Sequence, residues 1–247
     1  MRIKQTHISN SINAFKNQYI NKFDLFEGED ISVPVVFFGM YSDADYEMFK
    51  RWQNKVVIVW CGTDSLMITP GRAAILKRVK ATHIVKSQFC SDDLKKFGIP
   101  HKIIPISWQE QNIEPRPLGD CIYHYGNSNA YGNHLLDEIA KKTGLHIYKT
   151  DYKTFNKKDL LKIYEKCFIG LRLTKHDGLP NTVLELGLMG RRCIYNGGIP
   201  NSISWKGIDD ICDNIKLEYA CRHENNTVEV AKEVKEFINI GDKWLEV

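Results

Sequence analysis

The sequence predicts an α/β protein with two doubly wound parallel sheets, one after the other along the chain. Short apolar runs of strand length alternate with segments of helical period through most of the 247 residues. The loops between them are short, which favours right-handed strand–helix–strand crossovers. The alternation pauses once, at a polar segment with two prolines over residues 109–119, and then restarts. That pause predicts a linker between two domains.

The part of the chain before the pause predicts four strands and three helices. The first strand is a run of valines and phenylalanines, and an amphipathic helix follows it. A short helix with a Ser-Asp-Asp cap ends before Gly98 and Pro100. The expected strands are 33–38, 56–60, 82–85 and 102–106, and the expected helices are 43–52, 71–79 and 91–97.

The part after the pause predicts four more strands and four helices. The expected strands are 121–125, 145–148, 167–173 and 193–195, and the expected helices are 134–142, 158–166, 182–190 and 227–237. We therefore expect a first domain at residues 1–115, a second at 116–226 and a C-terminal helical segment at 227–247. In open α/β sheets the ligand lies beyond the carboxyl ends of the strands, so the loops at those ends should carry the chemistry.

The composition narrows the class of protein. A hydrophobic share of 43% with 26% charged residues is ordinary for a globular protein with a core of normal size. The net charge of +4 is too weak to indicate nucleic acid as a partner, but it is compatible with an anionic ligand or with peripheral contact with a membrane. The first residues lack the apolar stretch of a signal peptide, and no apolar run approaches the ~20 residues of a membrane span. We expect a cytoplasmic protein or one attached peripherally to a membrane.

The cysteines and histidines point away from disulfides and metal ions. The seven cysteines are scattered without a C-x-x-C pair, and most lie in apolar runs, which favours buried free thiols in a reducing compartment over disulfides. The eight histidines show no H-x-x-x-H spacing, so no metal ion and no cofactor are expected.

The segment 172–190 carries the clearest chemical signal. A buried strand leads into a polar loop, and Asn181 is expected to cap a helix that begins at Thr182, whose N-terminus suits a diphosphate. Gly178 lets backbone approach a ligand closely. Asp177 and Glu185 are carboxylates, each able to accept hydrogen bonds from two vicinal hydroxyls. Together these features predict a site for a sugar nucleotide.

The same segment, D-G-L-P-N-T-V-L-E-L-G-L-M-G, resembles the E-x7-E motif of the retaining GT-B glycosyltransferases of family GT4. Asp177 stands at the first acidic position of that motif and Glu185 at the second. A weaker similarity covers residues 83–100, where a strand ending in Ser precedes a family pattern that ends in G-V-P. The two matches cover about the latter two-thirds of the chain.

The resemblance implies a GT-B-like fold, with two Rossmann-like domains facing a central cleft. It implies transfer from a nucleoside-diphosphate sugar to a glycan or lipid-linked acceptor, with retention and without a required metal ion. Asp177 would hold donor-sugar hydroxyls, and Glu185 would hold the ribose. The C-terminal helix would pack back on the first domain, with Trp244 as its anchor. The backbone that would meet the sugar and phosphates is that of Leu179, Pro180, Asn181, Thr182 and Val183.

The sequence departs from the family in three places. The family carries an Arg and a Lys after the first strand of its second domain, but the loop here, YGNSNAYGNH, has neither. Arg172 or Lys175, which lie close to the motif in the sequence, are the candidates to supply the positive charge for the phosphates instead. The first acid is Asp rather than Glu, and the N-terminal domain is short.

Residues at other strand ends are candidates for binding, each weighed against a structural role. Gly126 and Asn127 follow the first strand of the second domain, and their backbone N–H groups are candidates for contact with a phosphate. The candidates for the acceptor side are Gly62, Thr63, Asp64, Lys86 and Ser87. For residues 62–64 a tight turn that caps the next helix is the equal alternative.

Two other functions stay open. The short N-terminal domain and the missing Arg and Lys favour a subunit that binds a sugar nucleotide without catalysis. A GT-B epimerase that acts on sugar nucleotides is the third possibility, and turnover without an acceptor would indicate it.

Overall fold

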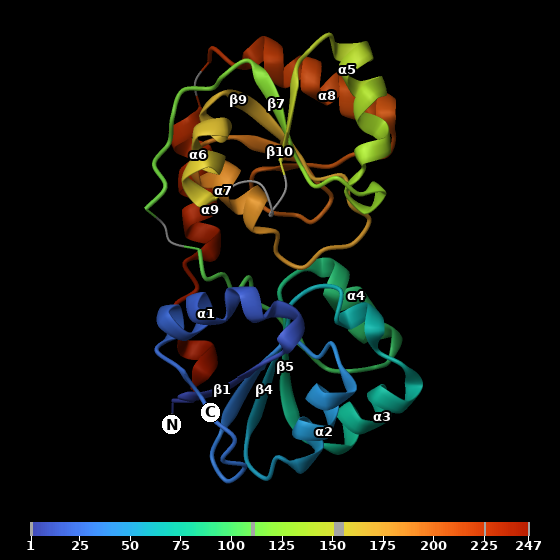
Figure 1. The fold of residues 1–247 in the computed structure, drawn as a ribbon, viewed down its shortest axis with the longest axis vertical. Coiled ribbons are helices and arrows are strands. Elements are labelled where there is room, and N and C mark those ends of the chain that lie inside the picture. Colours follow the sequence, from blue (N-terminus) through green and yellow to red (C-terminus); the bar gives the residue numbers. More distant parts are fainter. Residues whose placement is uncertain (1, 110–111, 151–155, 225, 247) are drawn as a thin grey trace. The chain divides into compact units, whose positions relative to one another are not determined.

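The computed structural model describes residues 2–109, 112–150, 156–224 and 226–246, which form two compact units (Figure 1). Unit 1 comprises Met1–Trp108, His176–Leu179 and Asn239–Val247. Unit 2 comprises Gln109–Lys175 and Pro180–Ile238. Each unit is built on one parallel sheet.

Unit 1 has a six-stranded sheet in the order β2-β1-β3-β4-β5-β6. All neighbouring strands are parallel, with Val35 opposite Val56 and Val56 opposite Ala81. The strands are β1 (Gln5–Ile8), β2 (Phe26–Glu27), β3 (Val35–Phe38), β4 (Val56–Trp60), β5 (Ala81–Val85) and β6 (Lys102–Ile103). The helices are η1 (Asn10–Phe15), α1 (Lys16–Phe23), α2 (Asp43–Arg51), η2 (Ser65–Met67), α3 (Pro70–Arg78), α4 (Gln88–Lys96) and η5 (Lys243–Leu245).

Helices cover both faces of the first sheet (Figure 1). Because successive side chains of a strand point to opposite faces, Val35 and Phe37 of β3 pack with α2, α3 and α4, whereas Val36 and Phe38 pack with α1. All four side chains are fully buried. Strands covered on both faces are apolar throughout, which is why the sequence pattern identified β3 and β4.

The last residues of the chain belong to unit 1. Leu245 is buried there, and its carbonyl accepts a hydrogen bond from the Ile3 N–H at 2.9 Å. The Trp244 ring packs edge-on against Phe23 and Phe38, with centroids 5.2 and 6.2 Å apart. The preceding helix, α9 (Thr227–Ile238), packs on α7 in unit 2, so the expected segment 227–247 is divided between the two units.

Unit 2 has a five-stranded sheet in the order β11-β10-β9-β7-β8, again parallel throughout. Helices α5 and α8 pack together on one face, and α6, α7 and α9 lie on the other (Figure 1). The strands are β7 (Cys121–Tyr125), β8 (Ile147–Thr150), β9 (Cys167–Leu171), β10 (Arg192–Ile194) and β11 (Ser202–Ile203). The remaining helices are η3 (Asn129–Tyr131), η4 (Asn133–Leu135), α5 (Leu136–Thr143), α6 (Lys157–Glu165), α7 (Asn181–Leu188) and α8 (Ile208–Cys221).

Several elements differ from the sequence-based expectation. The strands β1, β2 and β11 and the helices α1 and α8 were not expected. β1 reads Gln-Thr-His-Ile, and this mixed pattern gives no apolar run although its residues are largely buried. Helix α4 begins earlier than expected, because Ser87 caps it by accepting the Cys90 N–H at 3.3 Å. The expected Ser91 cap is wrong, since Ser91 lies inside the helix.

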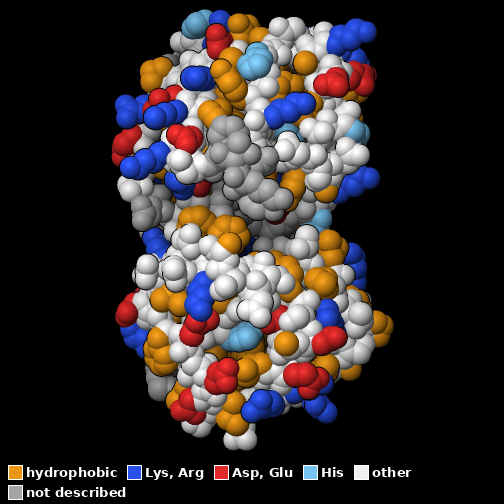
Figure 2. All heavy atoms as spheres, viewed as in Figure 1, with side chains coloured by type: hydrophobic (Ala, Val, Ile, Leu, Met, Phe, Trp, Pro, Cys, Tyr) orange, Lys and Arg blue, Asp and Glu red, His pale blue; other side chains and the backbone are white. Residues whose placement is uncertain are grey.

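Charged side chains of both signs are interspersed over the visible face of each unit, consistent with the mild net charge (Figure 2). All seven cysteines are free thiols, and four of them are buried. Within the described part of the chain, no helix combines the length and apolar character needed to cross a bilayer.

Candidate active site

The carboxyl edge of the second sheet brings several candidate residues together. The strand order reverses between β7 and β9, and such a switch point is where open α/β sheets bind ligands. Gly126 directly follows β7, Arg172 directly follows β9, and α7 begins after the loop that Arg172 leads into. This edge of unit 2 is therefore the candidate donor site.

Arg172 is held at this edge by aromatic rings. Arg172 is only 7% exposed. Its guanidinium carbon lies 4.3 Å from the centroid of the Tyr131 ring and 5.3 Å from that of the Tyr125 ring. A guanidinium over a ring face is attracted by the ring quadrupole. The loop YGNSNAYGNH lacks cations of its own, but it supplies the rings that position this one. The sequence identified Arg172 by proximity and gave no sign of its aromatic support.

The turn after β7 is shaped by the same ring. Gly126 has a φ of +95°, and a Cβ there would lie 2.4 Å from the Tyr131 ring, so only glycine fits. Its N–H donates to the Thr150 carbonyl at 2.8 Å. The expectation that this N–H meets a phosphate is therefore wrong, because the sheet already uses it. Asn127 is exposed at the tip of the turn.

Helix α7 begins one residue earlier than the sequence suggested. Val183 and Leu184 both donate to the Pro180 carbonyl, at 3.1 and 3.3 Å, so Pro180 is the N-cap. The assignment of Asn181 as N-cap is wrong, and no side chain caps the helix. The N–H groups of Asn181 and Thr182 precede the first intrahelical bonds and point out of the helix start, where the dipole favours an anion.

Glu185 lies inside unit 2 and is surrounded by donors. The residue is 5% exposed. Its Oε1 accepts hydrogen bonds from Lys157 Nζ and Gln109 Nε2, both at 2.7 Å, and its Oε2 accepts one from the Tyr164 hydroxyl at 3.1 Å. Burial raises the pKa of Tyr164 well above its usual value, so the phenol remains a donor. A buried carboxylate needs such partners, and a ribose diol would have to displace one of them.

Asp177 lies in unit 1 and Glu185 in unit 2. The Asp177 carboxylate accepts the Gly178 N–H at 2.8 Å, and its carbonyl accepts the Ser87 hydroxyl, also at 2.8 Å. A Cβ on Gly178 would lie 2.1 Å from the Cys61 carbonyl oxygen. Gly178 was expected to allow close approach of a ligand, but the close approach it allows is to protein backbone.

The residue before Asp177, His176, is held by contacts with residues far away in the sequence. His176 Nε2 lies 2.7 Å from Asp93 Oδ2, and that carboxylate also accepts the Ser65 hydroxyl at 2.8 Å. No sequence pattern links Asp93 to His176, because the two residues lie far apart along the chain and meet only in the folded protein. Lys175 is exposed.

Asp64 has a structural role. It is fully buried, and its carboxylate accepts the backbone N–H groups of Cys61, Gly62 and Met40 at 2.7–3.2 Å. Burial raises its pKa although these N–H groups favour the charged form. Residues 62–64 form a tight turn that ties the ends of β3 and β4 together, and their part in binding an acceptor stays a prediction. Thr63 is exposed beside it.

Lys86 is a buried cation at the carboxyl end of β5. It is 7% exposed, and its Nζ donates to the Tyr19 hydroxyl at 2.8 Å. No carboxylate of the described residues forms an ion pair with it. Burial alone would lower the pKa of Lys86, but its interactions with Tyr19 and Cys61 raise the pKa above its ordinary value, so the group stays an ammonium. The adjacent Ser87 caps α4 and holds the Asp177 carbonyl.

Clusters of metal-binding side chains are absent from the described residues: no three His, Cys, Asp or Glu residues lie together as ligands would. Within unit 2, the candidate site consists of Arg172 on its rings, the start of α7 and the engaged Glu185.

Among known proteins, this chain is similar in fold to several solved structures. No protein-family model matches the chain, and no curated protein matches it. Sucrose-phosphate synthase from Thermosynechococcus elongatus is similar over 93% of this chain and 73% of its own, with a TM-score of 0.60 and 11% identity. AviGT4, a glycosyltransferase involved in avilamycin A biosynthesis, is similar over 99% and 96%, with a TM-score of 0.60 and 10% identity.

TarM is a third similar structure. It matches 88% of this chain and 55% of its own, with a TM-score of 0.62 and 13% identity, so this chain spans about half the length of TarM. A mutant of the S. aureus protein was crystallised with fondaparinux, α-GlcNAc-glycerol and UDP. At these identities the likeness concerns the fold, which is that of the GT-B glycosyltransferases with two parallel Rossmann-like sheets.

Proposed function

We propose that the protein is a glycosyltransferase that moves a sugar from a nucleoside-diphosphate sugar to a hydroxyl of a glycan or lipid-linked acceptor, with retention. The observation that carries the proposal is the presence of Arg172 and the N-terminus of α7 at one carboxyl edge of a Rossmann-like sheet. Both groups attract a diphosphate. The UDP bound to TarM, which shares the fold, supports a nucleoside diphosphate as the leaving group.

In the proposed reaction, charge develops on the leaving diphosphate and is stabilised by Arg172 and the N–H groups of Asn181 and Thr182. Fixed donors aimed at developing charge are an effective source of catalysis. The acceptor oxygen bonds to the anomeric carbon, the bond from that carbon to the phosphate oxygen breaks, and the acceptor proton leaves with the diphosphate. Asp177 would hold hydroxyls of the donor sugar.

The remaining predicted residues have supporting roles in this proposal. The backbone of Leu179 to Val183 contacts the donor, with Asn127 beside it. Glu185 binds the ribose after Lys157, whose side chain is 46% exposed and able to swing away, releases Oε1. Lys86 and Ser87 lie on the acceptor side.

One observation favours the alternative of a non-catalytic subunit that binds sugar nucleotides. Glu185 is already engaged by Lys157, Gln109 and Tyr164, and this network would also serve a purely structural purpose. Release of nucleoside diphosphate separates the two functions, because only the transferase produces it.

The test is a panel of UDP-, GDP-, ADP- and dTDP-sugars, read first by thermal shift and then by release of nucleoside diphosphate with mixed glycan acceptors. A ligand at 100 times its Kd stabilises the folded state by about 2.7 kcal/mol. We expect one nucleotide to stabilise the protein, and Arg172→Gln to remove that effect. Lys141→Gln, which changes an exposed cation on α5, is the matched control. Failure of every donor to bind or turn over would overturn the proposal.

A further inference from the structure

Lys157 is the exposed member of an otherwise buried group of hydrogen-bonding side chains in unit 2. Glu185 accepts hydrogen bonds from three side chains there, those of Lys157, Gln109 and Tyr164. Gln109 and Tyr164 are each 1% exposed, whereas the Lys157 side chain is 46% exposed. Lys157 is therefore the partner that can leave Glu185 without opening the core.

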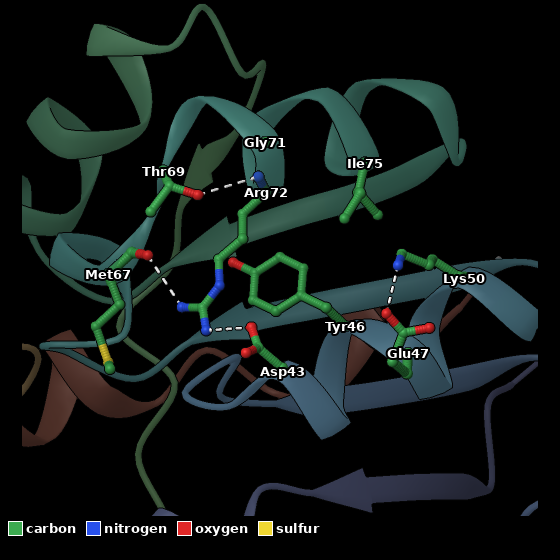
Figure 3. A pocket seen from close by; sticks show the side chains of 9 residues that line it. All are labelled: Asp43, Tyr46, Glu47, Lys50, Met67, Thr69, Gly71, Arg72 and Ile75. Atoms are coloured by element: carbon green, nitrogen blue, oxygen red, sulfur yellow. Dashed lines mark hydrogen bonds and ion pairs between the residues drawn. The ribbon is translucent and has the colours of Figure 1, made fainter.

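Two ion pairs of unit 1 have the opposite asymmetry. Along the pocket between α2 and α3, Arg72 pairs with Asp43, and Lys50 pairs with Glu47 (Figure 3). In both pairs the carboxylate is more exposed than its cation, so the acid is the partner that solvent reaches first. At Glu185 the carboxylate is enclosed, and the cation is the partner that can move.

The Glu185 carboxylate stays in place when Lys157 leaves. A carboxylate has about four acceptor positions, two on each oxygen. In this structure Oε1 accepts from both Lys157 and Gln109, and Oε2 accepts from Tyr164. Without Lys157, each oxygen keeps one buried donor and has one open position. Two open positions on neighbouring oxygens match the two hydroxyls of a ribose diol.

The Lys157 ammonium lies near the start of α7. Glu185 is four residues after Asn181, the first residue of that helix. Four residues rise about 6 Å along a helix, and side chains lean toward its N-terminus. The Glu185 carboxylate and the ammonium bonded to it are therefore held close to the helix end that suits a phosphate. The flexible stem of a lysine lets its ammonium turn from one anion to another nearby.

The ligand itself supplies that second anion. A diol is uncharged, so a diol that takes the position of Lys157 leaves the ammonium without its carboxylate partner. A nucleoside diphosphate carries its phosphates on the same ribose, so both arrive in one binding event. The loop after β7, YGNSNAYGNH, has no Lys or Arg for them, and lysine binds phosphate well as a point charge.

We propose that Lys157 moves from Glu185 to a phosphate oxygen of the donor when the ribose diol takes its position on Oε1. The proposal rests on the function proposed above, and it adds Lys157 to Arg172 as a cation for the diphosphate. A nucleoside alone has to separate the ion pair without compensation, whereas a nucleoside diphosphate provides the new partner. Lys157 thereby makes the site select for the phosphates and the ribose together.

The test compares nucleosides with their diphosphates on the full chain: uridine with UDP, guanosine with GDP, and adenosine with ADP. Calorimetry measures binding of the diphosphates, and ligand-observed NMR measures that of the nucleosides. We expect Lys157→Gln to weaken diphosphate binding about tenfold and to leave nucleoside binding unchanged or tighter. Lys157→Arg keeps the charge and should retain most of the diphosphate affinity. Lys158→Gln, at the exposed neighbour on α6, is the matched control.

Two results would overturn the proposal, provided that thermal melts show each variant to be folded. Diphosphate binding by Lys157→Gln as tight as that of the wild type, or tighter, would show that Lys157 only blocks Glu185. Equal losses for nucleoside and diphosphate would show that Lys157 only holds the carboxylate. Failure of the proposed function has a different sign, because the wild type would then bind no nucleoside diphosphate at all.

Discussion

Lys157 Nζ lies 2.7 Å from Glu185 Oε1, so the carboxylate expected to hold a ribose is paired with a lysine of α6. The pair is asymmetric, since the Glu185 side chain is 6% exposed and that of Lys157 is 46% exposed. The lysine is therefore the partner that solvent can reach. Exchange of the lysine for a ribose diol is the event on which donor binding at Glu185 would depend.

We expect Glu185→Gln to weaken binding of the donor nucleotide about tenfold or more, because hydrogen bonds to a charged acceptor contribute about 1.5–3 kcal/mol. Calorimetric titration with the nucleoside diphosphate measures this. Glu165→Gln, which changes a half-exposed carboxylate at the end of α6, should bind normally. Equal affinities of the wild type and Glu185→Gln would contradict a ribose role.

Asp177→Asn should reduce turnover about a hundredfold with little change in nucleotide affinity. The amide keeps an oxygen for the Gly178 N–H, so the local turn is preserved while the charge is lost. A donor-sugar contact that strengthens in the transition state would affect kcat in this way. The readout is kcat beside the nucleotide Kd, and an unchanged kcat would remove Asp177 from the site.

Lys86→Met should destabilise the fold and impair transfer. The buried ammonium donates to the Tyr19 hydroxyl, and removing one partner of a buried hydrogen bond costs about 1–3 kcal/mol because the other is left unsatisfied. Urea unfolding measures the stability, and Lys80→Met, at an exposed site, should leave it unchanged. Unchanged stability of Lys86→Met would show that the fold does not need the cation.

Arg191 holds unit 2 together from inside, and Arg191→Met should destabilise it by about 3–5 kcal/mol. The side chain is fully buried, and burial lowers its pKa to about 10. It donates to the carbonyls of Tyr164 and Cys167 at 3.1 and 3.2 Å and to those of Arg116 and Pro117 at 2.7 and 2.6 Å. Without it the carbonyls of Arg116 and Pro117 would lose these donors, and those of Tyr164 and Cys167 would each keep only a backbone donor.

The neighbouring arginine provides the control for that prediction. Arg192 is 35% exposed and lies 3.8 Å from Glu218, so Arg192→Met should change the melting temperature little. Equal melting temperatures for Arg191→Met and Arg192→Met would refute the structural role of Arg191.

Stability should fall as the pH drops from 6.5 to 4 because of two buried histidines. Burial lowers the pKa of His83 and that of His124 to about 4, below the unfolded value of 6.5. In this window the unfolded chain binds protons that the folded protein does not, so each histidine removes up to roughly 3 kcal/mol of stability on acidification. Urea unfolding at pH 7, 5.5 and 4.5 should show a flatter profile for His124→Phe than for wild type. The exposed His134→Gln should follow the wild type.

The sequence by itself determined the α/β class, most of the interior strands and the candidate donor loop. These features are local: a strand buried on both faces is apolar throughout, and a helix of period 3.6 shows its own buried stripe. β1 escaped detection because Gln5 and Thr6 are buried yet polar, and the Thr6 hydroxyl bonds to the Val36 carbonyl across the sheet.

Only the tertiary structure decided what each candidate side chain meets. Strand order places Tyr131 under Arg172, α6 brings Lys157 to Glu185, and the turn after β4 encloses Asp64 among backbone N–H groups. Tertiary structure likewise put Asp177 and Glu185 in different units, although a single local motif contains both. The physical reason is that a carboxylate or guanidinium has no preferred partner along its own chain. Its hydrogen bonds are chosen by the groups that sheet order and burial bring within about 3 Å.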